Sequence, residues 1–377
     1  MNLRTMTVDK IVELIRETSS SLPEDVLKAL KAAQRREAKG SSAAVVLKTI
    51  LDNCAIAKKR GTPLCQDTGT LTFFVDERLR RKVTSAVLKK AVAIATERGY
   101  LRKNTIDAVT GRSYDDNVAP GAPVVHYVES GSVALGSAKV EVRSKDVKGL
   151  SSTLKDSHRL SATLKDLNGP LSTLKDPNGP FVTLVMKGGG SENMSRQYSL
   201  PDAALGAGRD LEGVRKCVLD AVQKIQGYGC APGILGVCIG GDRATGYEVA
   251  KEQLLRPLNE VEKLRSCEVE KSSASQPLSL STSQLLNLEK RLLKEANSLG
   301  IGPMGLGGKT TLLGVKVAAR PRVPASFFVT VAYMCWACRR CSLFLSPSVG
   351  CRSLAVLGAG LGQTTGDSRQ PGGKGKR

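Results

Sequence analysis

The stretch Thr62–Gly69, with the sequence Thr-Pro-Leu-Cys-Gln-Asp-Thr-Gly, places a cysteine directly beside an amide, a carboxylate and a hydroxyl. Because proline and glycine favour turns, we expect the Cys65 thiol to lie at the surface or in a cleft rather than in a core. From this stretch alone, an ordinary polar loop with an incidental cysteine is as good an interpretation as a reactive site. The choice between them depends on whether Cys65 has partners elsewhere in the chain.

Two of the other cysteines share the character of Cys65 in a chain that has ten in all. Cys230 and Cys335 each stand at the predicted end of a helix or strand, next to turn residues or polar groups. Soft thiolates are the usual ligands of iron–sulfur clusters. Three thiolates on a four-iron cluster would leave one iron open as a Lewis acid. By contrast, Cys217 and Cys238 fall on apolar elements and are interpreted as buried small hydrophobes.

Three further motifs could carry chemistry. Consecutive glycines in Lys187–Asn193 leave backbone N–H groups free to converge on an anion. Cys335-x-x-Cys338 resembles half of a zinc ribbon, but no second such pair or His pair completes a tetrahedral site. Gly307–Thr311 resembles the end of a phosphate-binding P-loop, but Pro303 stands where that motif needs a glycine. Nucleotide binding through Lys309 is therefore kept only as a minor alternative hypothesis.

Composition limits the possible partners. The 377 residues are 41% hydrophobic and 4% aromatic, which supports a core built from aliphatic side chains and alanine. No apolar run is long enough to span a membrane, and residues 1–10 lack the apolar segment of a secretory signal. We therefore expect no membrane partner and a cytoplasmic location. The net charge of +21 can indicate nucleic-acid binding, yet aromatic residues do not interleave with the basic ones as a stacking surface requires. A positive cleft for a small dianion explains the charge equally well.

Hydrophobic periodicity predicts an α/β (α+β) fold in which helices flank mixed β-sheets, with any iron–sulfur cluster held at loop ends. The Ser21–Glu24 stretch is interpreted as a fresh helix start with Ser21 as its cap. The expected helices are Val8–Asn53 with that one break, Val83–Tyr100, Leu211–Gln226, Ala244–Leu255 and Leu285–Leu299; the expected strands are Thr70–Val75, Val124–Val128, Val140–Val142, Val182–Val185, Ile234–Ile239, Val315–Val317 and Ser326–Met334.

Two regions do not fit this fold. Thr-Leu-Lys-Asp recurs at Thr153, Thr163 and Thr173, so residues 146–181 are interpreted as a low-complexity insert rather than part of the site. From residue 341 onward the pattern gives way to serine, glycine and basic residues. We expect one catalytic domain at 1–340 and a disordered basic tail at 341–377.

Five motifs in order resemble the class I, iron–sulfur-dependent fumarate hydratases and, more narrowly, the alpha subunit of the two-subunit form shared with tartrate dehydratase. The resemblance runs from about Ile11 to Arg340 apart from the insert. The motifs are Pro63–Gly69, Lys187–Asn193, Gly229–Pro232 with Ile239–Gly241, Gly300–Gly308 and Cys335-Trp336.

The resemblance implies a [4Fe-4S] cluster whose metal ligands are Cys65, Cys230 and Cys335. It implies that Asp67 is catalytic and that the substrate-binding residues are Gln66, Asp67, Arg102, Gly188, Gly189, Ser191 and Asn193. Physically, a guanidinium fork such as that of Arg102 suits a substrate carboxylate.

The implied activity is that of a hydro-lyase alpha subunit that reversibly hydrates a C4 dicarboxylate, fumarate to (S)-malate, with L-tartrate dehydration as the alternative. The remaining site residues, including the base, are implied to lie on a separate beta subunit in a heterotetramer. Val323 stands where many relatives carry a His. An inactive homologue acting as a basic nucleic-acid-binding or scaffold protein is therefore a further alternative.

Overall fold

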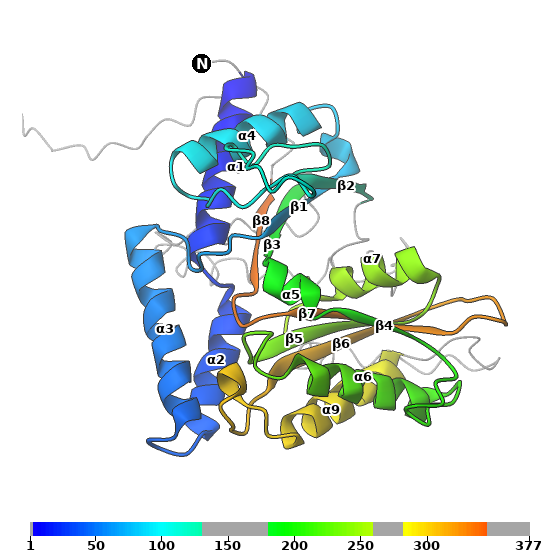
Figure 1. The fold of residues 1–377 in the computed structure, drawn as a ribbon. Coiled ribbons are helices and arrows are strands. Elements are labelled where there is room, and N and C mark those ends of the chain that lie inside the picture. Colours follow the sequence, from blue (N-terminus) through cyan, green and yellow to red (C-terminus); the bar gives the residue numbers. More distant parts are fainter. Residues whose placement is uncertain (1–2, 130–179, 259–281, 345–377) are drawn as a thin grey trace, which may run out of the picture.

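A computed structural model describes residues 3–129, 180–258 and 282–344 of the chain (Figure 1). Most of the predicted insert, the predicted strand Val140–Val142 and the tail from residue 345 lie outside the described residues. The predicted end of the insert, residue 181, is one residue too late, because Phe181 already belongs to a strand.

The described elements in chain order are α1 (Leu3–Ser20), α2 (Glu24–Arg36), α3 (Ser42–Arg60), β1 (Thr70–Asp76), the 3₁₀ helix η1 (Glu77–Leu79), α4 (Ser85–Glu97), β2 (Val124–Val128), β3 (Phe181–Lys187), α5 (Gly189–Asn193), β4 (Arg196–Ser199), α6 (Leu211–Ile225), β5 (Gly233–Gly240), α7 (Arg243–Gln253), α9 (Thr282–Ser298), the 3₁₀ helix η5 (Pro303–Gly305), β6 (Leu312–Arg320), β7 (Phe328–Met334) and β8 (Arg339–Phe344).

The first sheet has the strand order β2-β1-β3-β8. β1 runs parallel to β2 and antiparallel to β3, and β3 is antiparallel to β8. Alternate side chains of β1 point to opposite faces, as a strand requires. Leu71, Phe73 and Val75 face a buried cluster that also contains residues of α1 and α4, such as Leu14 and Leu88.

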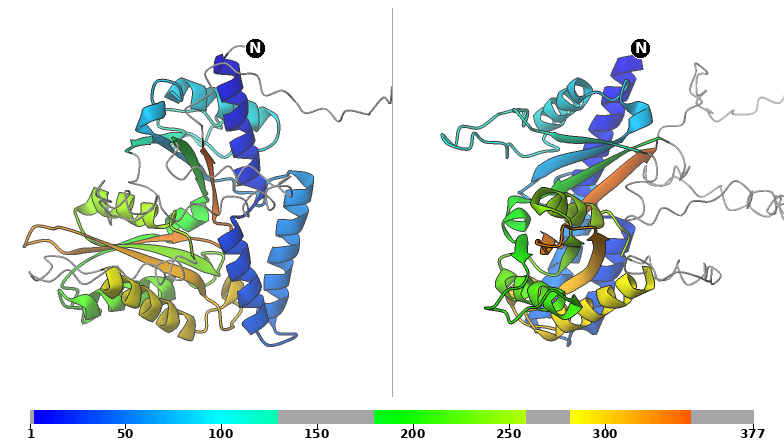
Figure 2. Two further views of the ribbon diagram at one scale, coloured as in Figure 1. Left: turned by 180° about the vertical axis from the view of Figure 1, so that it is seen from behind. Right: turned by 90° about the vertical axis from the view of Figure 1, so that its right-hand side faces the viewer.

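The second sheet has the order β4-β7-β5-β6, with β5 and β6 parallel and the other pairs antiparallel. α6 and α9 cover one face through a cluster that includes Val218 and Leu292. The other face carries α7 (Figures 1 and 2). A third cluster fills the space between the sheets and contains residues of α2, α3 and α7 together with Val185 of β3 and Met334 of β7. The two sheets therefore share a core.

The predicted mixed α/β class is confirmed, and the expected helices and strands within the described residues occur close to their predicted places. The single break expected within Val8–Asn53 is wrong, because residues 37–41 form a second break that separates α2 from α3. The prediction that Ser21 caps the second helix is wrong. Pro23 precedes the first helical residue of α2 without a side-chain cap. The Ser21 N–H still donates to the Glu17 carbonyl, so this serine ends α1 rather than beginning α2.

The first residues of the predicted tail are a strand instead. Residues 341–344 belong to β8, whose Leu184-to-Cys341 and Val182-to-Leu343 pairings continue the first sheet. The sequence signal was weak because the strand begins with the basic pair Arg339-Arg340 and only the short apolar run Leu343–Leu345 follows before the serine-rich stretch.

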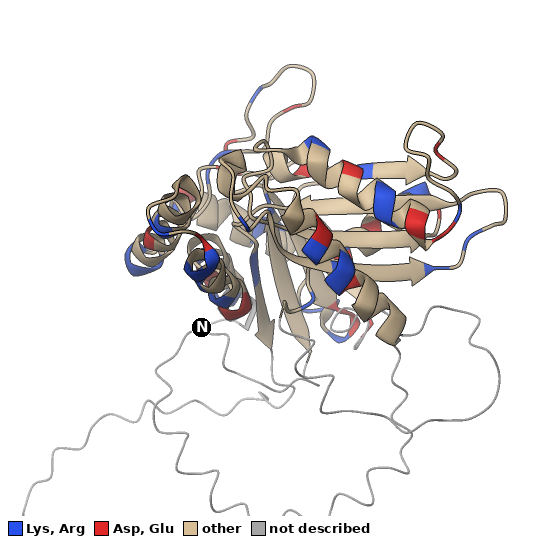
Figure 3. Cartoon of the chain, turned by 90° about the horizontal axis from the view of Figure 1, so that it is seen from below, with Lys and Arg blue, Asp and Glu red and all other residues tan. Residues whose placement is uncertain are grey.

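Basic and acidic side chains are interspersed along the outer helices (Figure 3). Many belong to exposed pairs one helical turn apart, such as Lys48 with Asp52. Among the residues that the structure describes, no helix has the length and apolar character needed to cross a lipid bilayer. The cytoplasmic location stays a prediction.

A buried ion pair fastens β8 to α2. Arg340 Nη2 lies 2.6 Å from Asp25 Oδ2, and both side chains are about nine-tenths buried. The same carboxylate oxygen accepts the Leu258 N–H at 2.9 Å. Removing one member of such a pair leaves an uncompensated buried charge.

We expect Asp25→Asn to lower the free energy of unfolding by about 3–5 kcal/mol, because it leaves the Arg340 guanidinium buried and unpaired. The matched control is Asp52→Asn, which breaks a pair whose side chains are more than half exposed and should cost about 0–1 kcal/mol. Urea denaturation followed by circular dichroism measures both. Equal costs for the two variants would contradict a structural role for the Asp25–Arg340 pair.

Candidate functional site

Three loops from distant parts of the sequence carry the predicted ligands. Cys65 lies in the turn between α3 and β1, Cys230 lies between α6 and β5, and Cys335 follows β7. The turn that carries Cys65 leads into the end of the first sheet where Thr70 pairs with Lys187 and Met186 pairs with Arg339. We call this end of the first sheet the site end.

Backbone contacts fix the Cys65 turn. The Leu64 N–H donates to the Ser19 carbonyl at 2.8 Å, and the Asn53 side chain donates to the Leu64 carbonyl at 3.0 Å. On the other side of the turn, Gly69 has φ +74°, and a Cβ there would lie 2.3 Å from the Lys187 carbonyl oxygen. Only glycine allows the turn to pass this close to the end of β3.

The Cys230 and Cys335 loops are tied to each other. The Trp336 N–H donates to the Cys230 carbonyl at 3.3 Å. Cys230 itself has φ +51°, an uncommon value for a residue with a side chain. Such a conformation persists only where its surroundings enforce it, and it is enriched at functional sites.

The Cys335 loop is also tied to α5. The Cys335 N–H donates to Ser191 Oγ at 3.1 Å, and Ser191 is buried. Two residues earlier, the Tyr333 N–H donates to Ser195 Oγ at 3.2 Å. The two serines thus attach the end of β7 to the segment that follows β3.

The three predicted ligands act on one another electrostatically. Burial raises the pKa of the Cys230 thiol, and the charges of Cys335, Cys65 and Asp67 raise it further. All three cysteines are free thiols. Anionic thiolates that repel one another in this way are stabilised by a cation placed among them, which matches the donor set of an iron–sulfur cluster.

The surroundings also fit a cluster. Tyr333 Oη is buried and has no hydrogen-bond partner among the described residues, and the charges of Cys335 and Cys230 act on it. A Cβ at Gly229 or Gly233 would collide with the Tyr333 ring, so the residues around Cys230 are small where the ring lies against them. An unpaired hydroxyl beside two thiols can donate to a bound inorganic or thiolate sulfur.

Within residues 3–129, 180–258 and 282–344, no three His, Cys, Asp or Glu side chains are arranged to hold a metal ion. A four-iron cluster makes a different demand, since each thiolate binds a different iron and the sulfur atoms need not converge on one point.

The Asp67 carboxylate is oriented by two donors. Its Oδ2 accepts the Gly189 N–H at 2.7 Å, and its Oδ1 accepts the Asn104 side-chain amide at 3.0 Å. A Cβ at Gly188 would lie 2.8 Å from Asp67 Oδ2. The glycines therefore do bind an anion, as the sequence predicts, and the structure identifies this anion as the chain's own Asp67. Gly188–Gly190 all avoid positive φ, and Gly189 begins the short helix α5.

Lys187 was not among the predicted site residues. Its buried ammonium group is paired with the Glu192 carboxylate and lies 3.4 Å from Ser195 Oγ. Burial lowers the pKa of Lys187, although Glu192 opposes this shift. For Glu192, burial would raise the pKa, but the Lys187 and Lys251 ammonium groups lower it overall. The sequence feature that could have identified Lys187 is a lysine at the end of a buried strand, directly before the consecutive glycines.

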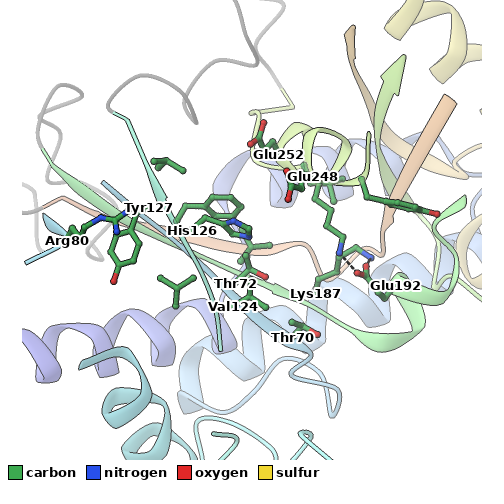
Figure 4. Close-up of a pocket in the computed structure, with 17 residues that line it drawn as sticks. Thr70, Thr72, Arg80, Val124, His126, Tyr127, Lys187, Glu192, Glu248 and Glu252 are labelled. Atoms are coloured by element: carbon green, nitrogen blue, oxygen red, sulfur yellow. Dashed lines mark hydrogen bonds and ion pairs between the residues drawn. The ribbon is translucent and has the colours of Figure 1, made fainter. Parts of the chain in front are cut away.

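A pocket of about 570 Å³ adjoins this ion pair (Figure 4). Lys187 and Glu192 line it, together with His126 of β2 and Glu248 and Glu252 of α7. None of the three predicted cysteine ligands lines this pocket. It therefore lies beside the thiol site rather than forming it.

Arg102 reaches the site through its backbone. Its N–H donates to Thr68 Oγ1 at 3.3 Å, and its carbonyl accepts the Asn117 side-chain amide at 2.7 Å. The side-chain oxygen Oδ1 of Asn117 also accepts the N–H groups of Asn104 and Thr105. Asn117 thus holds the base of this polar loop together, and the Arg102 backbone lies next to the Cys65 turn while the residue is exposed.

The structure does not tie every predicted residue to the site. The side chains of Gln66 and Asn193 are exposed. Val323 is 64% exposed and precedes β7, whose other end leads to Cys335, a separation of roughly 20 Å. A side chain at this position is therefore remote from the thiols of the same chain.

The glycine-rich loop that resembles a P-loop already binds a carboxylate. The Lys309 N–H donates to both oxygens of the buried Glu37 side chain, at 3.0 and 2.9 Å. A Cβ at Gly308 would lie 2.7 Å from the Ala43 Cβ. This loop joins the second sheet to the α2–α3 hairpin, and the space that a phosphate would need at this N–H is filled.

The family described as fumarate hydratase (fumerase) matches residues 8–145 and 171–343. A Geobacillus stearothermophilus protein named as a candidate class I fumarate hydratase is 40% identical over 347 residues, which cover 91% of this chain and 55% of the relative.

Two relatives of similar length are named as subunits. A Methanocaldococcus jannaschii protein named as a candidate L(+)-tartrate dehydratase subunit alpha is 29% identical over 88% of this chain and 95% of its own length. The L(+)-tartrate dehydratase subunit alpha of Escherichia coli K12 is 25% identical over 93% of this chain and 96% of its own. The chain thus spans about half the length of the Geobacillus relative and nearly all of the two subunits.

We expect Gly69→Ala to lower the free energy of unfolding by about 2–4 kcal/mol, because it adds left-handed strain and a clash with the Lys187 carbonyl. Gly99→Ala is the matched control: Gly99 also has φ +74°, but a Cβ there meets nothing within 4 Å. The control should cost about 1 kcal/mol from strain alone. Chemical denaturation of both variants checks the difference, and equal costs would argue against tight contact between the two loops.

Proposed function

Because the chain belongs to the fumarate hydratase (fumerase) family, we propose that it is the alpha-type component of a [4Fe-4S] hydro-lyase. Its reaction is the reversible hydration of a C4 dicarboxylate, fumarate to (S)-malate. The observation that supports this proposal is that Cys65, Cys230 and Cys335 are free thiols and that the charges of Cys335, Cys65 and Asp67 all act on Cys230.

The three cysteines hold the cluster at loop ends. When bound, the cluster supplies an open iron that polarises the hydroxyl group which leaves or adds. The hydrogen bond from the Cys335 N–H to Ser191 Oγ fixes the Cys335 loop on α5, and the bond from the Trp336 N–H to the Cys230 carbonyl holds two of the ligand loops together. Preorganisation of this kind is what a cluster site needs from its protein.

The remaining residues position the substrate. Asp67, oriented by Gly189 and Asn104, is the catalytic group and accepts a hydrogen bond from the substrate hydroxyl. The Arg102 guanidinium binds one substrate carboxylate in a bidentate manner. Gln66, Gly188, Gly189, Ser191 and Asn193 enclose the substrate on the sides next to Asp67.

A second polypeptide completes the site. Two relatives that match this chain along nearly their whole length are named as alpha subunits, while the Geobacillus relative continues well beyond the matched part. We infer that a beta-type partner contributes the proton-abstracting base and further carboxylate-binding residues in a heterotetramer.

L-Tartrate is the second candidate substrate. It is favoured by the match in length to proteins named as L(+)-tartrate dehydratase alpha subunits. Fumarate is favoured by the higher identity to the Geobacillus relative. Both substrates are C4 diacids whose hydroxyl and carboxylate groups make the same demands on Asp67 and Arg102.

Anaerobic reconstitution with iron and sulfide tests the cluster. The full-length chain should bind about four irons and four sulfides, and Cys65→Ser, Cys230→Ser and Cys335→Ser should each lose most of them. The matched control is Cys341→Ser, which changes another partly buried cysteine near Cys335 and should retain the cluster. A Cys230→Ser chain that still carries a full cluster would refute this set of ligands.

Arg102→Ala tests the substrate role. The variant should lose roughly 2–3 kcal/mol of transition-state binding, or about 30- to 150-fold in kcat/KM, because a charge-assisted carboxylate contact disappears. Arg112→Ala, in the same exposed loop, should change kcat/KM less than about twofold. Steady-state rates with malate and L-tartrate, on tagged chain isolated from its native cells together with its partner, decide both the role and the preferred diacid. Equal rates for the two variants would exclude Arg102 from the site.

A further inference from the structure

Arg339 carries a guanidinium that is almost completely buried. The residue is 1% exposed and begins β8 at the site end of the first sheet, a few residues after Cys335. Its Nη2 donates to the Asp67 backbone carbonyl at 2.8 Å. This one side chain therefore connects the strand that follows Cys335 to the turn that contains Cys65.

The charge of Arg339 has no acidic partner among the described residues. Its Nε and Nη1 groups also make no hydrogen bond there. The neighbouring Arg340 provides a contrast, because its guanidinium is paired with Asp25. A buried cation without a compensating anion costs several kcal/mol, so such a group is retained where an anion is to be held.

The site end gathers negative charge. The charges of Cys335, Cys65 and Asp67 act on the Cys230 thiol there, and the three cysteines would add negative charge when they bind metal as thiolates. A cluster bound by three thiolates, together with a dianionic substrate, adds to this negative charge. The Arg339 guanidinium donates a hydrogen bond to the backbone of Asp67, and Asp67 is only two residues after Cys65 in the sequence.

We propose that Arg339 is a positioning residue with two effects, the second of which rests on the proposed function. Its hydrogen bond holds the Cys65 turn in place in the cluster-free chain. Its uncompensated positive charge stabilises the bound cluster, and more so when the cluster is reduced. Positive charge near a cluster raises its reduction potential, because reduction adds negative charge.

Redox titration of the reconstituted full chain tests the second effect. Arg339→Gln removes the charge but can still donate to the Asp67 carbonyl, and its cluster potential should shift to more negative values. Arg339→Lys keeps the charge and should return the potential toward that of the unmodified chain. The matched control is the double variant Asp25→Asn with Arg340→Gln, which removes a neighbouring buried pair without changing the net charge and should leave the potential unchanged.

Hydrogen exchange on the cluster-free chain tests the first effect. Arg339→Ala should increase exchange at the backbone amides of residues 65–69 at least tenfold, and ethylguanidinium added to this variant should restore protection. Unchanged exchange at these amides in Arg339→Ala would refute the proposal that Arg339 positions the Cys65 turn.

The outcomes are separable. An Arg339→Gln cluster with the potential of the unmodified chain would refute the electrostatic effect. If Arg339→Gln assembles no cluster, restoration by Arg339→Lys supports the need for charge, and failure of Arg339→Lys refutes it. If the unmodified chain binds no iron and sulfide, the proposed function and the electrostatic effect fall together, while the exchange measurement still decides positioning.

Discussion

The contact between the Cys65 turn and the end of β3 is the constraint on which the site depends. Gly69 lets the turn pass over the Lys187 carbonyl, and Gly188 leaves room for the Asp67 carboxylate. The Gly189 N–H then captures this carboxylate, and Ser191 in the same short helix holds the Cys335 backbone. A continuous series of contacts thus leads from one predicted ligand to another through α5, and it uses backbone groups at nearly every step.

Both glycine-rich loops bind carboxylates of the chain itself. Asp67 accepts from Gly189, and Glu37 accepts from Lys309. Free N–H groups in such loops favour any anion, and sequence cannot say whether that anion is a ligand or a side chain. Here each loop connects, through this hydrogen bond, two elements that are distant in sequence. Asp67 differs from Glu37 in being only partly buried, so solvent reaches Asp67 more readily than Glu37.

Sequence reasoning was reliable where a local pattern decides the structure. Alternating apolar residues identified β1 and β3, and helical spacing identified α4, α6 and α9. The selection of Cys65, Cys230 and Cys335 as ligands, made because thiols beside turn residues are unusual, stays a prediction. Sequence reasoning was unreliable where long-range contacts decide the local structure. Ser21 resembles a cap but completes α1, and β8 becomes a strand because β3 provides an edge for it. The partners of Lys187 and Arg339 depend on tertiary contacts that no local pattern encodes.

The position of β8 has a consequence for how the protein is made. The Arg339–Asp67 hydrogen bond joins residues that are 272 positions apart in the chain. Closing so long a loop is slow relative to local folding, and it has to wait until the ribosome has released β8. During most of its synthesis the chain therefore presents Cys65 without its later partners. The arrangement of Cys65 with the end of β8 is therefore completed only after most of the chain has been synthesised.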